Sequence, residues 1–185
     1  NNDIEKVFIT ASGGPFNKFP LNKFNKITIK NALKHPKWKM GKKISIDSAT
    51  LMNKVFEIIE AKKIFDYKYN QLKILIHPDS YVHAIVKFNN GLTKILVHDT
   101  DMKIPIFNSF YTKHEKKIQT KKLNFNVLNK LNFTNVDIAK FPVVKILNTM
   151  PHNDSLFETV IVSANDKLVD LFLKKKITFN QISFF

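Results

Sequence analysis

The segment at residues 35–60 constrains the fold more than any other part of the chain. Its sequence is His-Pro-Lys-Trp-Lys-Met-Gly-Lys-Lys-Ile-Ser-Ile-Asp-Ser-Ala-Thr-Leu-Met-Asn-Lys-Val-Phe-Glu-Ile-Ile-Glu. This order of residue types predicts a loop, then a short strand, then a helix. Asp47 or Ser48 can act as the N-cap, because either side-chain oxygen can accept a hydrogen bond from a free N–H of the first turn. Apolar residues then recur at helical spacing and are expected to face a core, namely Met52, Val55, Phe56 and Ile59.

The same predicted helix carries a row of polar side chains. Asn53, Glu57 and Glu60 stand at positions i, i+4 and i+7, which share one helix face. Ser48, Asn53 and Lys54 fall within the first two predicted turns, where unpaired N–H groups and a partial positive charge favour a phosphate. Taken alone, however, the segment fits an ordinary amphipathic helix with a solvated polar stripe better than a phosphate site.

A glycine-containing turn follows the first predicted strand. Residues 5–10 read as a buried strand, and Ser12-Gly13-Gly14-Pro15 comes directly after it. Two glycines let the backbone approach a ligand closely, and Ser12 offers a hydroxyl. A plain turn at the end of a strand explains the same residues, so this motif alone does not establish a site.

The loop at residues 35–43 contains Trp38, the only tryptophan of the chain, among lysines. An indole in such surroundings is better explained as part of a lid than as part of a core. Gly41 gives the backbone freedom, and the ring would exclude water when the lid closes. A static surface loop with one buried ring is the alternative.

The middle of the chain predicts an antiparallel sheet. Residues 72–76, 82–88 and 92–97 are rich in Ile, Leu and Val, and Asn-Asn-Gly at 89–91 is a hairpin turn between the last two. A sheet backed by the helix at 48–65 gives an α+β layer. The nearby histidines show no zinc-ligand spacing and are interpreted as structural; they are His77, His83 and His98.

Composition excludes several classes of function. The net charge is +15, but all 30 basic residues are lysine, whereas arginine is the usual reader of bases and phosphates. The lysines are scattered without interleaved aromatic residues, so nucleic-acid binding is not expected. No apolar run is long enough to cross a membrane, and the lack of cysteine excludes disulfides and thiolate metal sites.

Three motifs together carry a family resemblance. They are Ser-Gly-Gly-Pro-Phe at 12–16, the whole of 35–60, and Ile-His-Pro-Asp-Ser-Tyr-Val-His at 76–83. Their sequence, order and spacing resemble the 1-deoxy-D-xylulose 5-phosphate reductoisomerase family. The resemblance implies NADPH-dependent rearrangement and reduction of a sugar phosphate, a Mg²⁺ or Mn²⁺ ion, and a homodimer formed through the sheet. It also implies a cytoplasmic location in a bacterium or a plastid location in a eukaryote.

Matching the motifs position by position transfers the family's roles to this chain. Glu57 and His35 would be catalytic, and Glu57 would also be a metal ligand. Gly41, Met40 and Met102 would lie beside the cofactor. The residues expected to bind substrate are Ser12, His35, Trp38, Ser48, Asn53, Lys54 and Glu57.

The resemblance also divides the chain and shows what it lacks. Residues 1–111 match the catalytic domain, 112–137 the linker and 138–185 the first part of a C-terminal helical domain. No Gly-rich dinucleotide fingerprint occurs, and the family's other two metal carboxylates lie upstream of the matched region. We therefore expect a fragment without the N-terminal Rossmann-type domain, inactive by itself. A shortened homologue that folds and dimerises without catalysis, and a basic nucleic-acid-binding module, remain as alternatives.

The chain departs from the family pattern at two positions near the predicted site. Val55 replaces the usual glycine after Asn53-Lys54, and Thr100 replaces the proline before Asp101-Met102.

Overall fold

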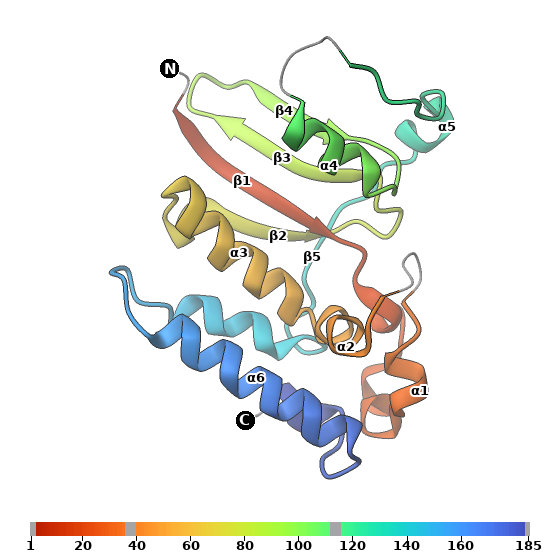
Figure 1. The fold of residues 1–185 in the computed structure, drawn as a ribbon, viewed down its shortest axis with the longest axis vertical. Coiled ribbons are helices and arrows are strands. Elements are labelled where there is room, and N and C mark those ends of the chain that lie inside the picture. Colours follow the sequence, from red (N-terminus) through yellow and green to blue (C-terminus); the bar gives the residue numbers. More distant parts are fainter. Residues whose placement is uncertain (1–2, 36–39, 112–115, 184–185) are drawn as a thin grey trace.

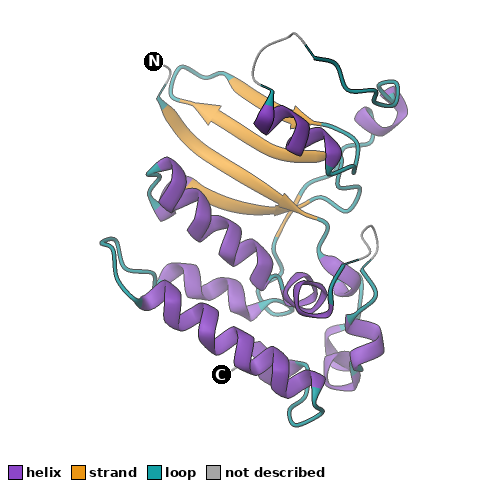
Figure 2. Ribbon diagram, viewed as in Figure 1, coloured by secondary structure: helices purple, strands orange, loops and turns teal. Residues whose placement is uncertain are grey.

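The computed structural model describes residues 3–35, 40–111 and 116–183. Figure 1 shows a sheet, helix α3 and helix α6 following one another along the long axis of the molecule, and Figure 2 shows the same view by secondary structure. The helices are α1 (Ile29–Ala32), α2 (Lys42–Thr50), α3 (Met52–Phe65), α4 (Lys103–Phe110), α5 (Phe125–Leu128) and α6 (Phe157–Leu173). Short 3-10 helices span Gly14–Phe16, Leu21–Lys26, Tyr69–Gln71, Pro142–Asn148 and Asn180–Ser183.

The sheet has five strands in the order β4-β3-β1-β2-β5. The strands are β1 (Ile4–Ala11), β2 (Leu72–Ile76), β3 (Val82–Phe88), β4 (Thr93–Val97) and β5 (Thr134–Asn135). Only β1 and β2 pair in parallel; the other pairs are antiparallel. The predicted α+β class with a mainly antiparallel sheet is therefore confirmed, as is the turn between β3 and β4, where the N–H of Gly91 bonds to the carbonyl of Phe88.

One face of the sheet is covered by α3. Ile74 and Ile76 of β2 share a buried cluster with Ile58 of α3 and with Phe141. Side chains alternate across a strand, so the neighbours of these residues point to the other face. On that face Phe8, Ile85 and Ile95 are paired in register across three strands. Phe8 and Ile85 are half-buried, and Ile95 is 48% exposed.

The sequence prediction was wrong about the start of the long helix. The predicted short strand is part of α2, and α3 begins separately after Leu51, whose φ of 65° is left-handed. Ile46 and Ala49 stand three residues apart and both pack into the core with α6. This tertiary packing favours a helix over the strand that the β-branched residues suggested. Neither Asp47 nor Ser48 caps α3.

The four residues predicted to form the core face of the long helix do face the core. Met52 and Val55 are buried, and Phe56 and Ile59 are partly buried against them. Val55 is fully buried, so its side chain fills the core.

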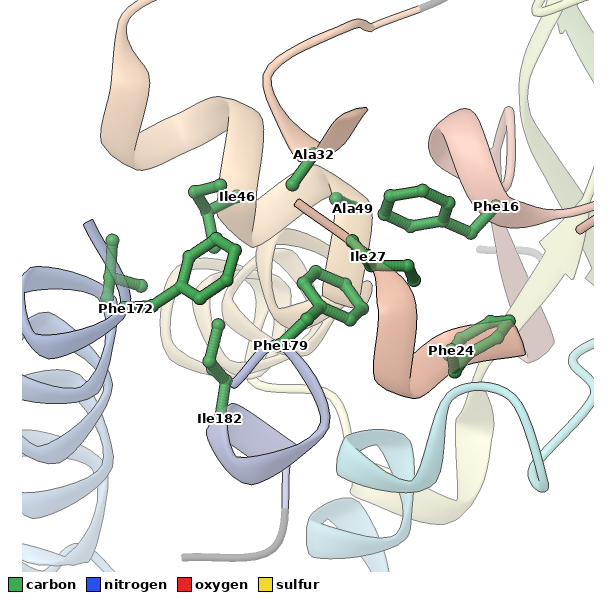
Figure 3. Packing of buried hydrophobic residues seen from close by; sticks show 10 residues of the cluster. Phe16, Phe24, Ile27, Ala32, Ile46, Ala49, Phe172, Phe179 and Ile182 are labelled. Carbon is green, nitrogen blue, oxygen red and sulfur yellow. The ribbon is translucent and has the colours of Figure 1, made fainter. Parts of the chain in front are cut away.

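The two ends of the chain share a core. Figure 3 shows Phe16 and Phe24 from the N-terminal part beside Phe179 and Ile182 from the C-terminal part. The rings of Phe16 and Phe179 lie 5.0 Å apart in an edge-to-face arrangement, which stabilises beyond the area buried. Residues 157–183 are therefore held against α2, which carries Ser48. No helix among the described residues is long and apolar enough to span a membrane.

Candidate active site

A cavity of about 790 Å³ lies over the carboxyl end of β1, between α3 and α4. Its floor includes Thr10 of β1 and Val82 of β3, and Pro105 of α4 forms part of one wall. Eight of the ten residues predicted to be catalytic or to bind substrate, cofactor or metal line it: Ser12, His35, Met40, Ser48, Asn53, Lys54, Glu57 and Met102.

The other two predicted site residues are Trp38 and Gly41. Trp38 lies outside the described residues. Gly41 is the N-cap of α2, where its carbonyl accepts hydrogen bonds from the backbone N–H and the hydroxyl of Ser45.

The Ser12 loop is packed directly against the end of α2. The hydroxyl of Ser12 accepts from the N–H of Gly14 at 3.2 Å and lies 3.5 Å from Nε2 of His35. Gly14 has a φ of +61°, and a Cβ added there would lie 2.8 Å from the carbonyl oxygen of Ser48. Only glycine fits this position without displacement. The close approach brings the two serines, 36 residues apart in sequence, to one side of the cavity.

The break between α2 and α3 brings polar groups from two helices together. Ser48 is in the last turn of α2, whereas Asn53 and Lys54 are in the first turn of α3. The left-handed Leu51 is buried and sits between them. The sequence predicted one helix for all three residues. In the structure they lie on two helices, and the turn at Leu51 brings them close together.

Glu57 holds the two polar residues of α3. Its Oε1 accepts from Nδ2 of Asn53 at 2.7 Å, and its Oε2 accepts from Nζ of Lys54 at 2.6 Å. The Lys54 and Glu57 side chains are only 19% and 32% exposed. The cavity therefore contains a partly desolvated cation and a partly desolvated anion one helical turn apart.

Two histidines interpreted as structural from the sequence lie in the cavity wall, His83 and His98. The rings of His83 and His98 are stacked with centroids 3.6 Å apart and planes 9° apart, and both residues line the cavity. Nε2 of His83 lies 3.1 Å from the carbonyl oxygen of His98. A carbonyl only accepts, so in the neutral ring Nε2 carries the proton and Nδ1 is an acceptor. The motif at 76–83 contained His83, but only the pairing of β3 with β4 reveals its partner.

Burial controls the protonation of two histidines in the cavity. Burial lowers the pKa of His83 most strongly; the hydrogen bond to the His98 carbonyl raises it, and electrostatic interaction with the His98 ring and with Lys54 lowers it further. Burial also lowers the pKa of His35. His77, in contrast, has the structural role expected: it is fully buried, stacks on Phe133, and its Nδ1 lies 2.9 Å from the carbonyl of Asn132.

The described residues do not form a complete metal site. No group of three or more His, Cys, Asp or Glu side chains among them is placed to hold an ion. Glu57 fits the role of a single oxygen ligand, because its carboxylate is ionisable, faces the cavity and is the kind of hard ligand that Mg²⁺ and Mn²⁺ prefer.

Comparison with known proteins identifies one family. Residues 1–65 match the model of the 1-deoxy-D-xylulose 5-phosphate reductoisomerase C-terminal domain, and residues 98–185 match the model of the DXP reductoisomerase C-terminal domain. The chain is 65% identical over 182 residues to the 1-deoxy-D-xylulose 5-phosphate reductoisomerase of Pelagibacter ubique (strain HTCC1062), covering 98% of this chain and 47% of that protein. It is 42% identical over 180 residues to the same enzyme of Persephonella marina (strain DSM 14350 / EX-H1), with 97% and 48% covered.

Solved structures agree with the sequence comparisons. A crystal structure of DOX-P reductoisomerase in complex with NADPH, fosmidomycin and magnesium superposes with a TM-score of 0.85 at 34% identity, covering 98% of this chain and 44% of that one. The enzyme from Zymomonas mobilis in complex with NADPH gives a TM-score of 0.88 at 32% identity, with 98% and 46% covered. The chain thus spans about half the length of the relatives it matches. Over that span it belongs to the 1-deoxy-D-xylulose 5-phosphate reductoisomerase family.

Proposed function

We propose that this chain supplies the substrate- and metal-binding half of a reductoisomerase that converts 1-deoxy-D-xylulose 5-phosphate to 2-C-methyl-D-erythritol 4-phosphate with NADPH. The observation that carries the proposal is a single cavity in which Ser12, Ser48, Asn53 and Lys54 lie beside Glu57. Hydroxyl, amide and ammonium donors suit a phosphate, and a carboxylate next to them suits the cation that the reacting end of the substrate requires.

The phosphate would be held by donors from three separate elements. Ser12 comes from the loop after β1, Ser48 from α2, and Asn53 with Lys54 from α3. Donors that converge from different directions fix both the position and the orientation of a tetrahedral anion. Binding energy gained at the phosphate then positions the distant carbon atoms that react.

Glu57 would contribute one oxygen ligand to Mg²⁺ or Mn²⁺. The ion, when bound, would polarise the carbonyl and hydroxyl oxygens of the substrate. The remaining ligands would be the family's two other metal carboxylates, which lie upstream of the region that this chain matches. Nε2 of His35 lies 3.5 Å from the Ser12 hydroxyl, so His35 would contact the substrate next to this phosphate donor.

NADPH would approach the cavity beside Met40 and Met102, which are two of its lining residues. The cofactor, when bound, would supply the hydride. Gly41 adjoins Met40 at the start of α2, where its lack of a side chain leaves space. The proposed nucleotide-binding fold lies outside this chain, and the described residues contain one mixed sheet only. The division into a catalytic domain at 1–111, a linker at 112–137 and the start of a helical domain at 138–185 belongs to the same proposal.

We also propose that the protein is a homodimer. Phe8, Ile85 and Ile95 form an apolar row across three strands on the sheet face opposite α3. Phe8 and Ile85 are only half-buried in this row, and Ile95 is 48% exposed. A second copy of the sheet would remove these side chains from water.

A chimera tests the proposed catalytic function. The 182 matching residues of the Pelagibacter ubique enzyme are replaced by this chain, and NADPH oxidation is followed after addition of substrate and Mg²⁺. We expect turnover by the chimera and none by this chain alone. Lys54→Ala in the chimera should raise KM, whereas Lys87→Ala, which removes an exposed pair with Glu5, should not. A folded chimera without activity, or a Lys54→Ala chimera with parental KM, would falsify the assignment.

A further inference from the structure

A buried carboxylate joins α2 to α6. Asp47, the residue before Ser48, is 2% exposed and has both of its oxygens engaged. Nδ2 of Asn165 donates to Oδ1 at 2.8 Å, and Nζ of Lys43 lies 2.8 Å from Oδ2. Lys43 also lies 3.0 Å from Oδ1 of Asp166. Burial would lower the pKa of the Lys43 ammonium, but the hydrogen bonds and charges of Asp47 and Asp166 outweigh burial and raise it.

Asn165 lies on the buried face of α6, directly between two apolar residues. It stands four residues after Ile161 and four before Val169, both buried, and is itself 2% exposed. Its Oδ1 has no hydrogen-bond partner among the described residues. A buried amide oxygen without a partner costs free energy, so an apolar residue would serve packing alone better. What the amide adds is a directional bond to a buried charge on α2.

The Ser12 loop also packs against α2, at Ser48 and Ala49. The carbonyl of Ser48 lies so close to Gly14 that an added Cβ would be only 2.8 Å away. Ile46 and Ala49 meanwhile pack into the same cluster as Val169 and Phe172 of α6. Apolar contacts of this kind permit small rotations and translations of a helix, whereas a charge-assisted hydrogen bond fixes its geometry.

We propose that Asn165 is a positioning residue for the phosphate site. Its hydrogen bond to Asp47 fixes the rotation of α2 about its own axis and its position along that axis. The Ser48 hydroxyl is thereby placed next to Ser12, Asn53 and Lys54. The inference rests on the proposed role of Ser48 in holding phosphate. It also gives residues 157–183 a part in substrate binding, although none of them lines the cavity.

The experiment compares Asn165→Ala with the parent chain by two independent readouts. Isothermal titration with inorganic phosphate measures the phosphate affinity of the site. Amide hydrogen exchange over residues 45–51 measures the local opening of α2. We expect phosphate to bind roughly tenfold more weakly, which is close to the lower end of what one hydrogen bond to a charged group contributes. We also expect faster exchange at 45–51. Both are measured well below the unfolding temperature of each variant.

Two further variants distinguish positioning from general stability. Asp170→Asn on the same helix removes an exposed ion pair with Lys174 and should leave both readouts at their parental values. The double variant Asp47→Asn with Asn165→Asp exchanges the amide and the carboxylate. It should restore slow exchange and near-parental phosphate affinity, because the hydrogen bond is reformed with the roles reversed.

The outcomes separate this inference from the function on which it rests. Parental affinity and parental exchange in a folded Asn165→Ala chain overturn the positioning role. If the parent chain itself does not bind phosphate, the phosphate assignment fails, and the exchange rates at 45–51 still decide whether Asn165 positions α2. If Asn165→Ala does not fold, the double variant decides: a folded double variant with fast exchange at 45–51 overturns the proposal.

Discussion

The ammonium of Lys54 lies 2.6 Å from Oε2 of Glu57, across one turn of α3, and both residues line the same cavity. The two groups neutralise each other, yet we propose that Lys54 binds the phosphate and that Glu57 binds the metal cation. A cation at Glu57 would release Lys54 toward the phosphate, and a phosphate at Lys54 would release Glu57 toward the cation. Binding at the two subsites is therefore expected to be reciprocal.

The first prediction tests whether Glu57 competes with phosphate for the Lys54 ammonium. Glu57→Gln keeps the side-chain size but removes the charge that holds Lys54. We expect inorganic phosphate to bind several-fold more tightly to Glu57→Gln than to the parent in the absence of metal, measured by isothermal titration. Glu5→Gln, which also removes a carboxylate from a lysine pair but far from the cavity, should change affinity little. Weaker phosphate binding by Glu57→Gln would contradict the competition.

The second prediction concerns the same residue in catalysis. In the chimera, Glu57→Gln should need much more Mg²⁺ for activity and should lose kcat even at saturating metal, because a neutral amide is a poor ligand for a hard cation. The fold should be intact by circular dichroism. Glu60 also lines the cavity, and we expect Glu60→Gln to matter far less. If Glu57→Gln kept the parental metal dependence, α3 would not carry a metal ligand.

The third prediction concerns Gly14, where backbone conformation and contact coincide. Gly14→Ala should destabilise the chain by about 1–2 kcal/mol from the left-handed conformation alone. A further loss should follow from displacing Ser48. Gly91→Ala is the matched control, because Gly91 also has a positive φ but an added Cβ meets nothing within 4 Å. Denaturant unfolding should show the larger loss for Gly14→Ala, and only that variant should weaken phosphate binding. Equal losses would mean that the contact with Ser48 is unimportant.

The fourth prediction is a dependence of stability on pH. Burial and nearby positive charge lower the pKa of His83, and burial lowers that of His35, so the folded chain resists protonation more than the unfolded chain. The unfolded state then binds more protons, and stability falls as the pH drops below about 6.5. The loss is complete once the pH passes below the lowered folded pKa values. Thermal unfolding between about pH 5 and pH 7.5 measures it, and His83→Gln should flatten part of the slope. An unchanged slope would show that His83 does not contribute.

The fifth prediction tests the proposed dimer. Ile95→Lys places a charge in the apolar row of the open sheet face and should convert a dimer to a monomer in sedimentation velocity. Ile64→Lys is the control, because Ile64 is 64% exposed at the end of α3, on the covered side of the sheet. A parent chain that sediments as a monomer, or a dimer that survives Ile95→Lys, would count against this interface.

Local sequence determined much of this protein. The periodicity of Met52, Val55 and Ile59 specified the core face of α3, and alternating apolar residues with a glycine turn specified the β3–β4 hairpin. These features depend on contacts between residues close in sequence, where side-chain spacing alone decides which groups share a face. The three motifs likewise indicated Ser12, Ser48, Asn53, Lys54 and Glu57 as residues of one site, and all five line the same cavity.

Tertiary structure decided the features that depend on distant residues. Ile44 and Ile46 favoured a strand locally, but packing of Ile46 against α6 places them in a helix. Asp47 looked like a helix cap until Asn165, 118 residues away, proved to be its partner. His83 and His98 became cavity residues only through strand register. Such contacts form only when folding brings distant segments together. The spacing of residues within one segment therefore does not show which distant residue each side chain will contact.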